Sequence, residues 1–191
     1  MNEQIRKLIE ESIATKQRLL QDPVILDQLP VVVEKIVAAF KDGKRVYFCG
    51  NGGSAADAQH LAAELSGRFY ADRPALPAEA LHCNTSYLTA VANDYSYDII
   101  YQRLVAGYGQ AGDVLIGFST SGNSKNVVLA FEEARKRKML TVGLTGAKGG
   151  EMKNISDHWF GVPSNDTPRI QESHILLGHI ICQLVEERYF Q

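Results

Sequence analysis

The sequence predicts an α/β fold in which a parallel β-sheet is covered by helices on both faces. Short apolar segments alternate with stretches of helical periodicity along most of the chain, as in folds built from repeated strand and helix units. The segments expected to be strands are apolar throughout rather than alternating with polar residues. This pattern is typical of parallel strands that are buried on both faces.

Two helices are expected ahead of the first strand, within residues 1–43. Over positions 3–21 apolar residues recur among charged ones at nearly the helical period: Ile5, Leu8, Ile9, Ile13 and Leu20. This amphipathic helix needs an apolar surface to lie on. A second helix is expected after Pro23, with its end near Gly43, where a glycine easily takes a positive φ.

From residue 45 onward the expected strands and helices alternate. Strands are expected at 45–49, 79–83, 113–119, 140–146 and 158–163. Helices are expected at 54–65, at 85–94, at 97–108, at about 125–138 and at about 168–189. The segment 68–79, with Pro74 and Pro77, is expected to be a loop able to close over a site. Because no repeat, low-complexity segment or linker interrupts the pattern, a single domain over 1–191 is expected, with 1–43 as its two-helix extension.

Composition narrows the classes of partner. The chain has 191 residues, of which 45% are apolar, and 20 basic against 22 acidic residues give a formal charge of −2. Such a balance provides no positive field for nucleic acid or anionic lipid, so a small-molecule partner is expected. Three scattered cysteines favour neither a disulfide framework nor a thiolate metal site. With a charged N-terminus and no long apolar run, the chain is expected to be cytoplasmic, without nucleic-acid or membrane partners.

Two glycine- and serine-rich loops suit an anionic ligand. The first, Gly50-Asn51-Gly52-Gly53-Ser54, follows the first expected strand, and the second, Ser119 to Ser124, follows the third. In parallel sheets ligands bind beyond the carboxyl ends of strands, where backbone N–H groups of helix N-termini attract phosphate. Neither loop is a P-loop or a clean dinucleotide fingerprint, so a simple phosphorylated metabolite is the expected ligand. The plainer alternative is that Gly, Ser and Asn are common turn and capping residues.

Seven segments together resemble a known family. They are CGNGGS (49–54), AQHLAAELSGRF (58–69), AVAND (90–94), GDVLIGFSTSGNS (112–124), LTGAKGG (144–150), RIQESHILLGHIICQLVE (169–186) and the helical N-terminus. The chain resembles, over nearly its whole length, the SIS (sugar isomerase) domains that bind phosphosugars, and within them the phosphoheptose isomerases. STSGNS is common to SIS domains, whereas His60 and Glu64 together with RIQE and His179 are a narrower match.

The resemblance implies a flavodoxin-like or Rossmann-like fold, a three-layer αβα sandwich with a five-stranded parallel sheet. It also implies that the outer helices pack into a homotetramer, with active sites at subunit interfaces. It implies interconversion of sedoheptulose 7-phosphate, a phosphorylated seven-carbon sugar, and D-glycero-D-manno-heptose 7-phosphate through an enediol, toward lipopolysaccharide or another surface polysaccharide. Glu64 is the expected base on carbon, and His179 is the expected proton shuttle at oxygen. Zinc is expected on four residues: His60, Glu64, Gln171 and His179. Substrate contacts are expected from Asn51, Gly52, Gly53, Ser54, Arg68, Asn93, Asp94, Ser119, Thr120, Ser121, Ser124 and Gln171.

Each assignment has a plainer alternative. A His–Glu pair at i, i+4 is most often a solvated surface pair, and His179 among apolar neighbours is typical of a satisfied core histidine. Arg68 and Arg169 either orient the substrate or pair with Asp72 and Glu172. A ligated carboxylate is a weak base, so the metal and base roles of Glu64 compete. His82, His158 and His174 are expected to be structural, and Trp159 to pack in a strand.

The chain departs from the family at Pro168, where many phosphoheptose isomerases have an acidic residue; Asp166 lies two positions earlier. This departure puts a third catalytic carboxylate in doubt. Two other functions remain open. One is a non-enzymatic SIS protein that binds a replication initiator; that relative lacks the residues matching Glu64 and His179. The other is an isomerase of arabinose or hexulose phosphates.

Overall fold

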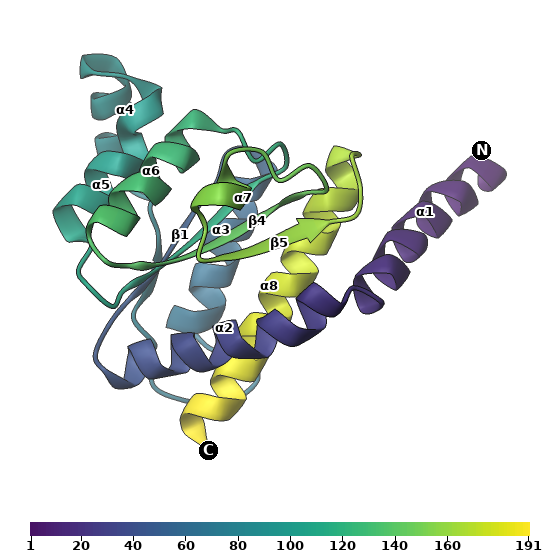
Figure 1. Cartoon of the computed structure of the whole chain (residues 1–191), viewed down its shortest axis with the longest axis horizontal. Helices are drawn as coiled ribbons and strands as arrows, with labels where there is room; N and C mark the ends of the chain where they lie inside the picture. Colours follow the sequence, from purple (N-terminus) through teal and green to yellow (C-terminus); the bar gives the residue numbers. More distant parts are fainter.

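Five parallel strands form the centre of the computed structural model, which describes residues 1–191. The strands lie in the order β2-β1-β3-β4-β5 (Figure 1). Their bounds are β1 Val46–Cys49, β2 Ala78–Ala80, β3 Val114–Ser119, β4 Leu140–Gly146 and β5 His158–Val162. The expected five-stranded parallel sheet is therefore confirmed. Since β2 and β3 lie on opposite sides of β1, the strand order reverses between β1 and β3, and the crevice beyond the carboxyl ends of these two strands is the usual ligand position in this topology.

Helices cover both faces of the sheet (Figure 1). Their bounds are α1 Asn2–Leu20, α2 Pro23–Lys41, α3 Gly53–Ser66, α4 Thr85–Asp94, α5 Ile100–Tyr108, α6 Lys125–Lys136, α7 Met152–Ile155 and α8 Thr167–Phe190, with a 3₁₀ turn at Tyr97–Ile99. α2, α3 and α8 pack with Val46, Phe48 and Ile116 in one apolar core. α5 and α6 pack with Tyr47 and Leu115 in a second core on the opposite face. Three layers result, as expected.

The strand residues alternate between these two cores, which explains why the strands are apolar throughout. Every residue of β1 and β3 is buried, with Phe48 and Ile116 facing one core and Tyr47 and Leu115 the other. Burying a large apolar side chain contributes roughly 1.5 to 3 kcal/mol. The sheet is therefore a rigid platform for the loops at its carboxyl edge.

The structure departs most from the expected elements at the ends of β2 and α6 and in one additional short helix. β2 ends at Ala80, not at 83, because a turn closed by Cys83 N–H on the Ala80 carbonyl takes the chain out of the sheet. α6 ends at Lys136, because Lys138 adopts a positive φ and Met139 donates back to Ala134, a Schellman-type ending. The short helix α7 is not predicted from the sequence.

α1 lies at the margin of the molecule and extends away from the sheet (Figure 1). Two hydrogen bonds and an ion pair attach it to the first turns of α8: Arg169 donates to the Leu8 carbonyl at 2.6 Å, Ser12 donates to Glu172 at 2.7 Å, and Lys16 lies 3.8 Å from Glu172. The apolar side chains of its free face are each about half exposed or more: Ile5, Leu8, Ile9, Ile13 and Leu20. The apolar surface that this amphipathic helix needs is thus not provided within one chain. No helix in the chain has the length and apolar content needed to cross a membrane.

Candidate active site at the carboxyl edge of the sheet

The serine loop, Ser119 to Ser124, joins β3 to α6 at the carboxyl edge of the sheet. Ser119 is buried, and its hydroxyl lies 2.8 Å from that of Ser124 and accepts from the Gly122 N–H at 3.1 Å. The Ser124 side chain does not cap α6, and of the N–H groups in the first turn only that of Val127 is engaged, by Asn126 Oδ1 and the Ser124 carbonyl, which leaves those of Lys125 and Asn126 without a partner. Hydroxyls and unpaired amides at a helix N-terminus form a polar site suited to an oxyanion.

Gly122 allows this loop to form. Its φ is +71°, and an added Cβ would collide with the backbone carbonyl of Gly149 in the β4–α7 loop. Met152 N–H in turn donates to the Gly122 carbonyl at 3.0 Å. The serine loop is thus held by close backbone contact with the loop that follows β4.

A cavity of about 370 Å³ opens beside the serine loop. Thr120 and Ser121 line it on one side, and Ile170 in the first turns of α8 on another. Four further polar residues line it that sequence reasoning did not select: Lys148, Ser164, Asn165 and Thr167. The signal for them was present, because they follow the carboxyl ends of β4 and β5 and the same rule had selected the loops after β1 and β3.

The first glycine loop lies against α8. A Cβ on Gly53 would lie 2.7 Å from the amide nitrogen of Gln171, so a larger residue there would require the Gln171 side chain to move. Asn51 forms a reciprocal amide pair with buried Asn126 of α6, at 2.9 and 2.8 Å, and also accepts from the Tyr97 hydroxyl. Gly52 is the N-cap of α3, with φ +56°, and Ser54 is buried. The two expected loops are thus linked through Asn51, which Asn126 holds in a fixed orientation.

Three side chains from α3 and α8 meet in one cluster. His60 and Glu64 lie one turn apart on α3, with Nε2 and Oε1 3.0 Å apart, and the His60 and His179 rings have centroids 4.9 Å apart. One ligand atom from each of His60, Glu64 and His179 lies within 4.8 Å of the others. Burial lowers the pKa of His179, and the nearby His60 lowers it further, while Glu64 raises it. A neutral imidazole of this kind can accept a proton or bind a metal.

Asp57 is a residue near this cluster that sequence reasoning missed. It lies one turn before His60 on α3, half-buried, and its Oδ2 has no hydrogen-bond partner within the chain. Burial raises the pKa of Asp57 to about 6, against the opposing effect of His60. Its position three residues before His60 was the available signal, since such residues share a helix face.

Several expected site residues have no link to the cluster within one chain. Arg68 is exposed and makes no hydrogen bond or ion pair, while Asn93 and Asp94 at the end of α4 bond only to each other, at 3.0 Å. Arg169 pairs with Glu172 at 2.6 Å, which is the plainer of its two expected roles. Asp166 is the N-cap of α8 and contacts neither the serine loop nor the cluster through its side chain.

The three histidines expected to be structural have different surroundings. His174 is fully buried, with Nε2 3.1 Å from the Thr145 carbonyl, and burial lowers its pKa to about 4. His158 Nδ1 lies 3.3 Å from Gln28 Oε1. Burial lowers the pKa of His158, and the positive charge of Lys35 lowers it further. Burial alone lowers the pKa of His82. Trp159 lies in β5 as expected and donates to Thr145.

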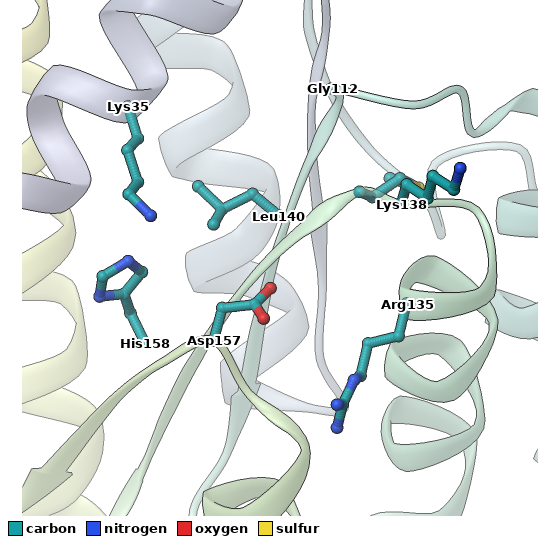
Figure 2. Close-up of a pocket in the computed structure, with 8 residues that line it drawn as sticks. Lys35, Gly112, Arg135, Lys138, Leu140, Asp157 and His158 are labelled. Carbon is teal, nitrogen blue, oxygen red and sulfur yellow. The ribbon is translucent and has the colours of Figure 1, made fainter.

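A larger cavity, about 530 Å³, lies at the opposite edge of the sheet. Figure 2 shows Lys35 reaching from α2 toward His158, with Asp157 beside them at the start of β5. Asp157 is already engaged, because it accepts from the Thr141 N–H at 2.8 Å and from its hydroxyl at 2.9 Å. Neither the serine loop nor the cluster of potential metal ligands adjoins this cavity, so it is not the candidate active site.

The chain is similar to known proteins over nearly its whole length. The SIS domain family matches residues 7–146. The phosphoheptose isomerase of Clostridium acetobutylicum is 52% identical over 97% of this chain and 95% of its own length, and that of Aneurinibacillus thermoaerophilus is 48% identical over 100% and 96%. The solved structure of phosphoheptose isomerase from Neisseria gonorrhoeae superposes with a TM-score of 0.91 at 40% identity, over 97% of this chain and 98% of that one.

These relatives bear on the functions that the sequence left open. All of the similarity above is to isomerases, and nothing in it favours a non-enzymatic protein that binds a replication initiator. The match also extends over nearly the full length of each relative, including α8 with its His179. The chain therefore belongs to the SIS domain family and, within it, to the phosphoheptose isomerases.

Proposed function

We propose that Glu64 and His179 carry out the proton transfers by which this protein interconverts sedoheptulose 7-phosphate and D-glycero-D-manno-heptose 7-phosphate. The observation that carries the proposal is their meeting, together with His60, within 4.8 Å, although they lie on helices far apart in the sequence. Moving a carbonyl between neighbouring carbons needs one group to take a carbon-bound proton and another to serve the oxygens. A carboxylate and a neutral imidazole side by side suit these two tasks.

The phosphate is proposed to bind in the serine loop and the adjoining cavity. α8 connects the two parts of the site, because Ile170 lines the cavity and His179 lies nine residues further along the same helix. This interval is a rise of about 13 Å along the helix axis, over about two and a half turns, and is not the separation of the two side chains. Anchoring the phosphate of an extended sugar would hold its reacting end in place near the cluster. Asn51 and Gln171, with the N–H groups at the start of α3, are proposed to contact the sugar between its two ends.

Zinc is proposed as the metal of the cluster. The donor set of two imidazoles and a carboxylate is typical of catalytic zinc sites with an open position. The three ligand atoms lie within 4.8 Å of one another, so small side-chain movements would bring them to one ion. Gln171 is the expected fourth ligand. A bound zinc would polarise a sugar oxygen as a Lewis acid. Glu64 would then have two functions, and metal analysis of its variants separates them.

A homotetramer is proposed as the working assembly. The exposed apolar face of α1 supports it, because several half-exposed large side chains on one helix are typical of a surface covered by another subunit. The isolation of Arg68, Asn93 and Asp94 within one chain also supports active sites at subunit interfaces. A second subunit packed against the exposed cluster edge, where His60 is 51% exposed, would bring such residues to the substrate.

The test is to incubate the protein with sedoheptulose 7-phosphate and follow the aldoheptose phosphate by anion-exchange chromatography. Glu64→Gln is expected to lower kcat by about 10² to 10⁴, the usual contribution of a general base. Glu132→Gln, an exposed change on α6, is the matched control and should leave the rate unchanged. Metal content is measured for each variant, with and without a chelator. An unchanged rate in metal-replete Glu64→Gln would refute the role of Glu64 as the base.

A further inference from the structure

A buried ion pair joins the loop after α3 to the last turns of α8. Arg73 Nε lies 2.8 Å from Glu186 Oε2, and the two side chains are only 2% and 5% exposed. The other salt bridges of the chain each include at least one side chain that is substantially exposed. A buried pair is costly to desolvate and is retained only where additional hydrogen bonds satisfy its remaining donors and acceptors. The partners of this pair therefore indicate what it does.

Glu186 fixes the start of the loop to α8. Its carboxylate accepts from three consecutive backbone N–H groups, those of Phe69 at 3.1 Å, Tyr70 at 2.8 Å and Ala71 at 2.8 Å. Burial alone would raise the pKa of Glu186, but these three N–H groups and the Arg73 guanidinium hold it at about 2. The carboxylate is therefore ionised near neutral pH, where it holds the start of the loop on α8.

Arg73 fixes the end of α3. Its guanidinium donates to the backbone carbonyls of Glu64 at 2.8 Å, Leu65 at 2.7 Å and Gly67 at 3.1 Å. Carbonyls in the last turn of a helix have no partners within the helix, so this side chain acts as a cap. One of the capped carbonyls belongs to Glu64 itself.

The pair also lies in line with His179. Glu186 follows His179 by seven residues on α8, which is about two turns, so both side chains project from the same side of the helix. Phe69, whose N–H is bound by Glu186, places its ring centroid 5.8 Å from that of His179. Contacts thus run from the pair to the backbone of Glu64 on α3 and to the imidazole of His179 on α8.

We propose that Arg73 and Glu186 are positioning residues for the isomerisation, which set the placement of Glu64 relative to His179 by clamping the end of α3 and the loop after it to α8. The proposal rests on the roles proposed above for Glu64 and His179. Neither Arg73 nor Glu186 touches the substrate. Their effect is transmitted through the backbone of Glu64 and through the Phe69 ring.

Two variants of the clamp separate positioning from stability. Arg73→Lys keeps the charge opposite Glu186, so the fold is retained, but one ammonium group cannot reach all three carbonyls at once. The double variant Arg73→Met with Glu186→Leu removes both charges and fills the space with apolar atoms, a replacement that often preserves stability. Val105→Ala in the core on the opposite face of the sheet is the stability control, because it loosens packing far from the clamp. Arg188→Lys changes an exposed ion pair on the same helix α8 and is the charge control.

Each variant is assayed for thermal midpoint, oligomeric state, kcat and KM for sedoheptulose 7-phosphate. In the two clamp variants kcat is expected to fall about 10- to 100-fold with KM within about threefold, as when reacting groups are displaced by about 1 Å. Both control variants should keep wild-type kcat, whatever their thermal midpoint. Loss of activity in Val105→Ala in proportion to its lost stability, matching the clamp variants, would overturn the proposal.

Arg73→Lys tests the positioning role even if the double variant does not fold. A folded Arg73→Lys protein with wild-type kcat would also overturn the proposal. Glu64→Gln is measured in parallel to keep the two proposals apart. If Glu64→Gln is inactive and the clamp variants are fully active, the positioning role alone fails. If Glu64→Gln is fully active, the assignment of the base fails, and the positioning role fails with it.

Discussion

Acid should destabilise the protein through His174, a fully buried imidazole between α8 and β4. Its Nε2 lies against the Thr145 carbonyl, while Nδ1 has no hydrogen-bond partner. Burial lowers the pKa of His174 from 6.5 to about 4 in the folded chain. Between pH 6.5 and pH 4 the unfolded chain therefore binds a proton at this position that the folded chain does not. Because the unfolded state binds more protons in this window, stability must fall as the pH falls.

The size of the effect follows from the shift in pKa. A difference of about 2.5 pH units corresponds to about 3 kcal/mol in full, at about 1.4 kcal/mol per unit. About 2 kcal/mol of this loss in the free energy of unfolding falls between pH 7.5 and pH 5, a range that is accessible to measurement. No charged partner in the fold offsets it, since the only polar contact of the ring is with a carbonyl oxygen.

Urea unfolding at a fixed protein concentration, followed by circular dichroism from pH 7.5 to pH 5, measures this contribution. The comparison is with His174→Gln, which keeps an amide donor for Thr145 but does not titrate. Other ionisable groups act equally in both proteins, so the free energy of unfolding of the wild type should drop by about 2 kcal/mol more than that of the variant. Parallel curves for the two proteins would refute the assignment of a neutral, buried His174.

Three further outcomes are expected. Glu186 has the opposite kind of titration, since its folded pKa of about 2 lies below the ordinary 4.5. Its contribution to stability is complete above about pH 5 and is lost as the pH falls toward 2. The free energies of unfolding of the wild type and of Glu186→Gln, measured with urea, should therefore converge in that range. Gly122→Ala should raise KM for the phosphosugar by at least about tenfold, because its Cβ meets the Gly149 carbonyl, whereas Gly43→Ala has the same φ of +71° in open space and should leave KM unchanged. Leu8→Asp on the exposed face of α1 should shift light scattering toward smaller species while helicity is retained; an unchanged mass would place the subunit contacts elsewhere.

The fold was largely predictable because strands and helices here are specified locally. Apolar runs such as 113–119 and 140–146 lie within a residue of β3 and β4. Where the prediction failed, the cause lies in tertiary contacts. β2 ends when the chain turns out of the sheet after Ala80, and α7 has only four residues, too few to show a helical period.

The candidate site was predictable only in part. Spacing placed His60 and Glu64 on one face of α3, but their meeting with His179 was expected from the family resemblance and not from the residues alone. The Arg73–Glu186 clamp joins positions 113 residues apart in the sequence, and no local pattern indicates such a pair. Asp57 and Lys148 were missed although a helix face and a strand end pointed to them.

The continuity of α8 has a consequence for how substrate preference can evolve. One unbroken helix of 24 residues spans the interval from the cavity beside the serine loop to the imidazole of His179. With the phosphate bound as proposed, the spacing between its anchor and His179 is set by a continuous helix, whereas a hinged loop could accommodate sugars of several sizes. Adapting the protein to a shorter or longer phosphosugar would therefore require moving the reacting groups to other positions of α8, and changes in the surface loops alone would not suffice.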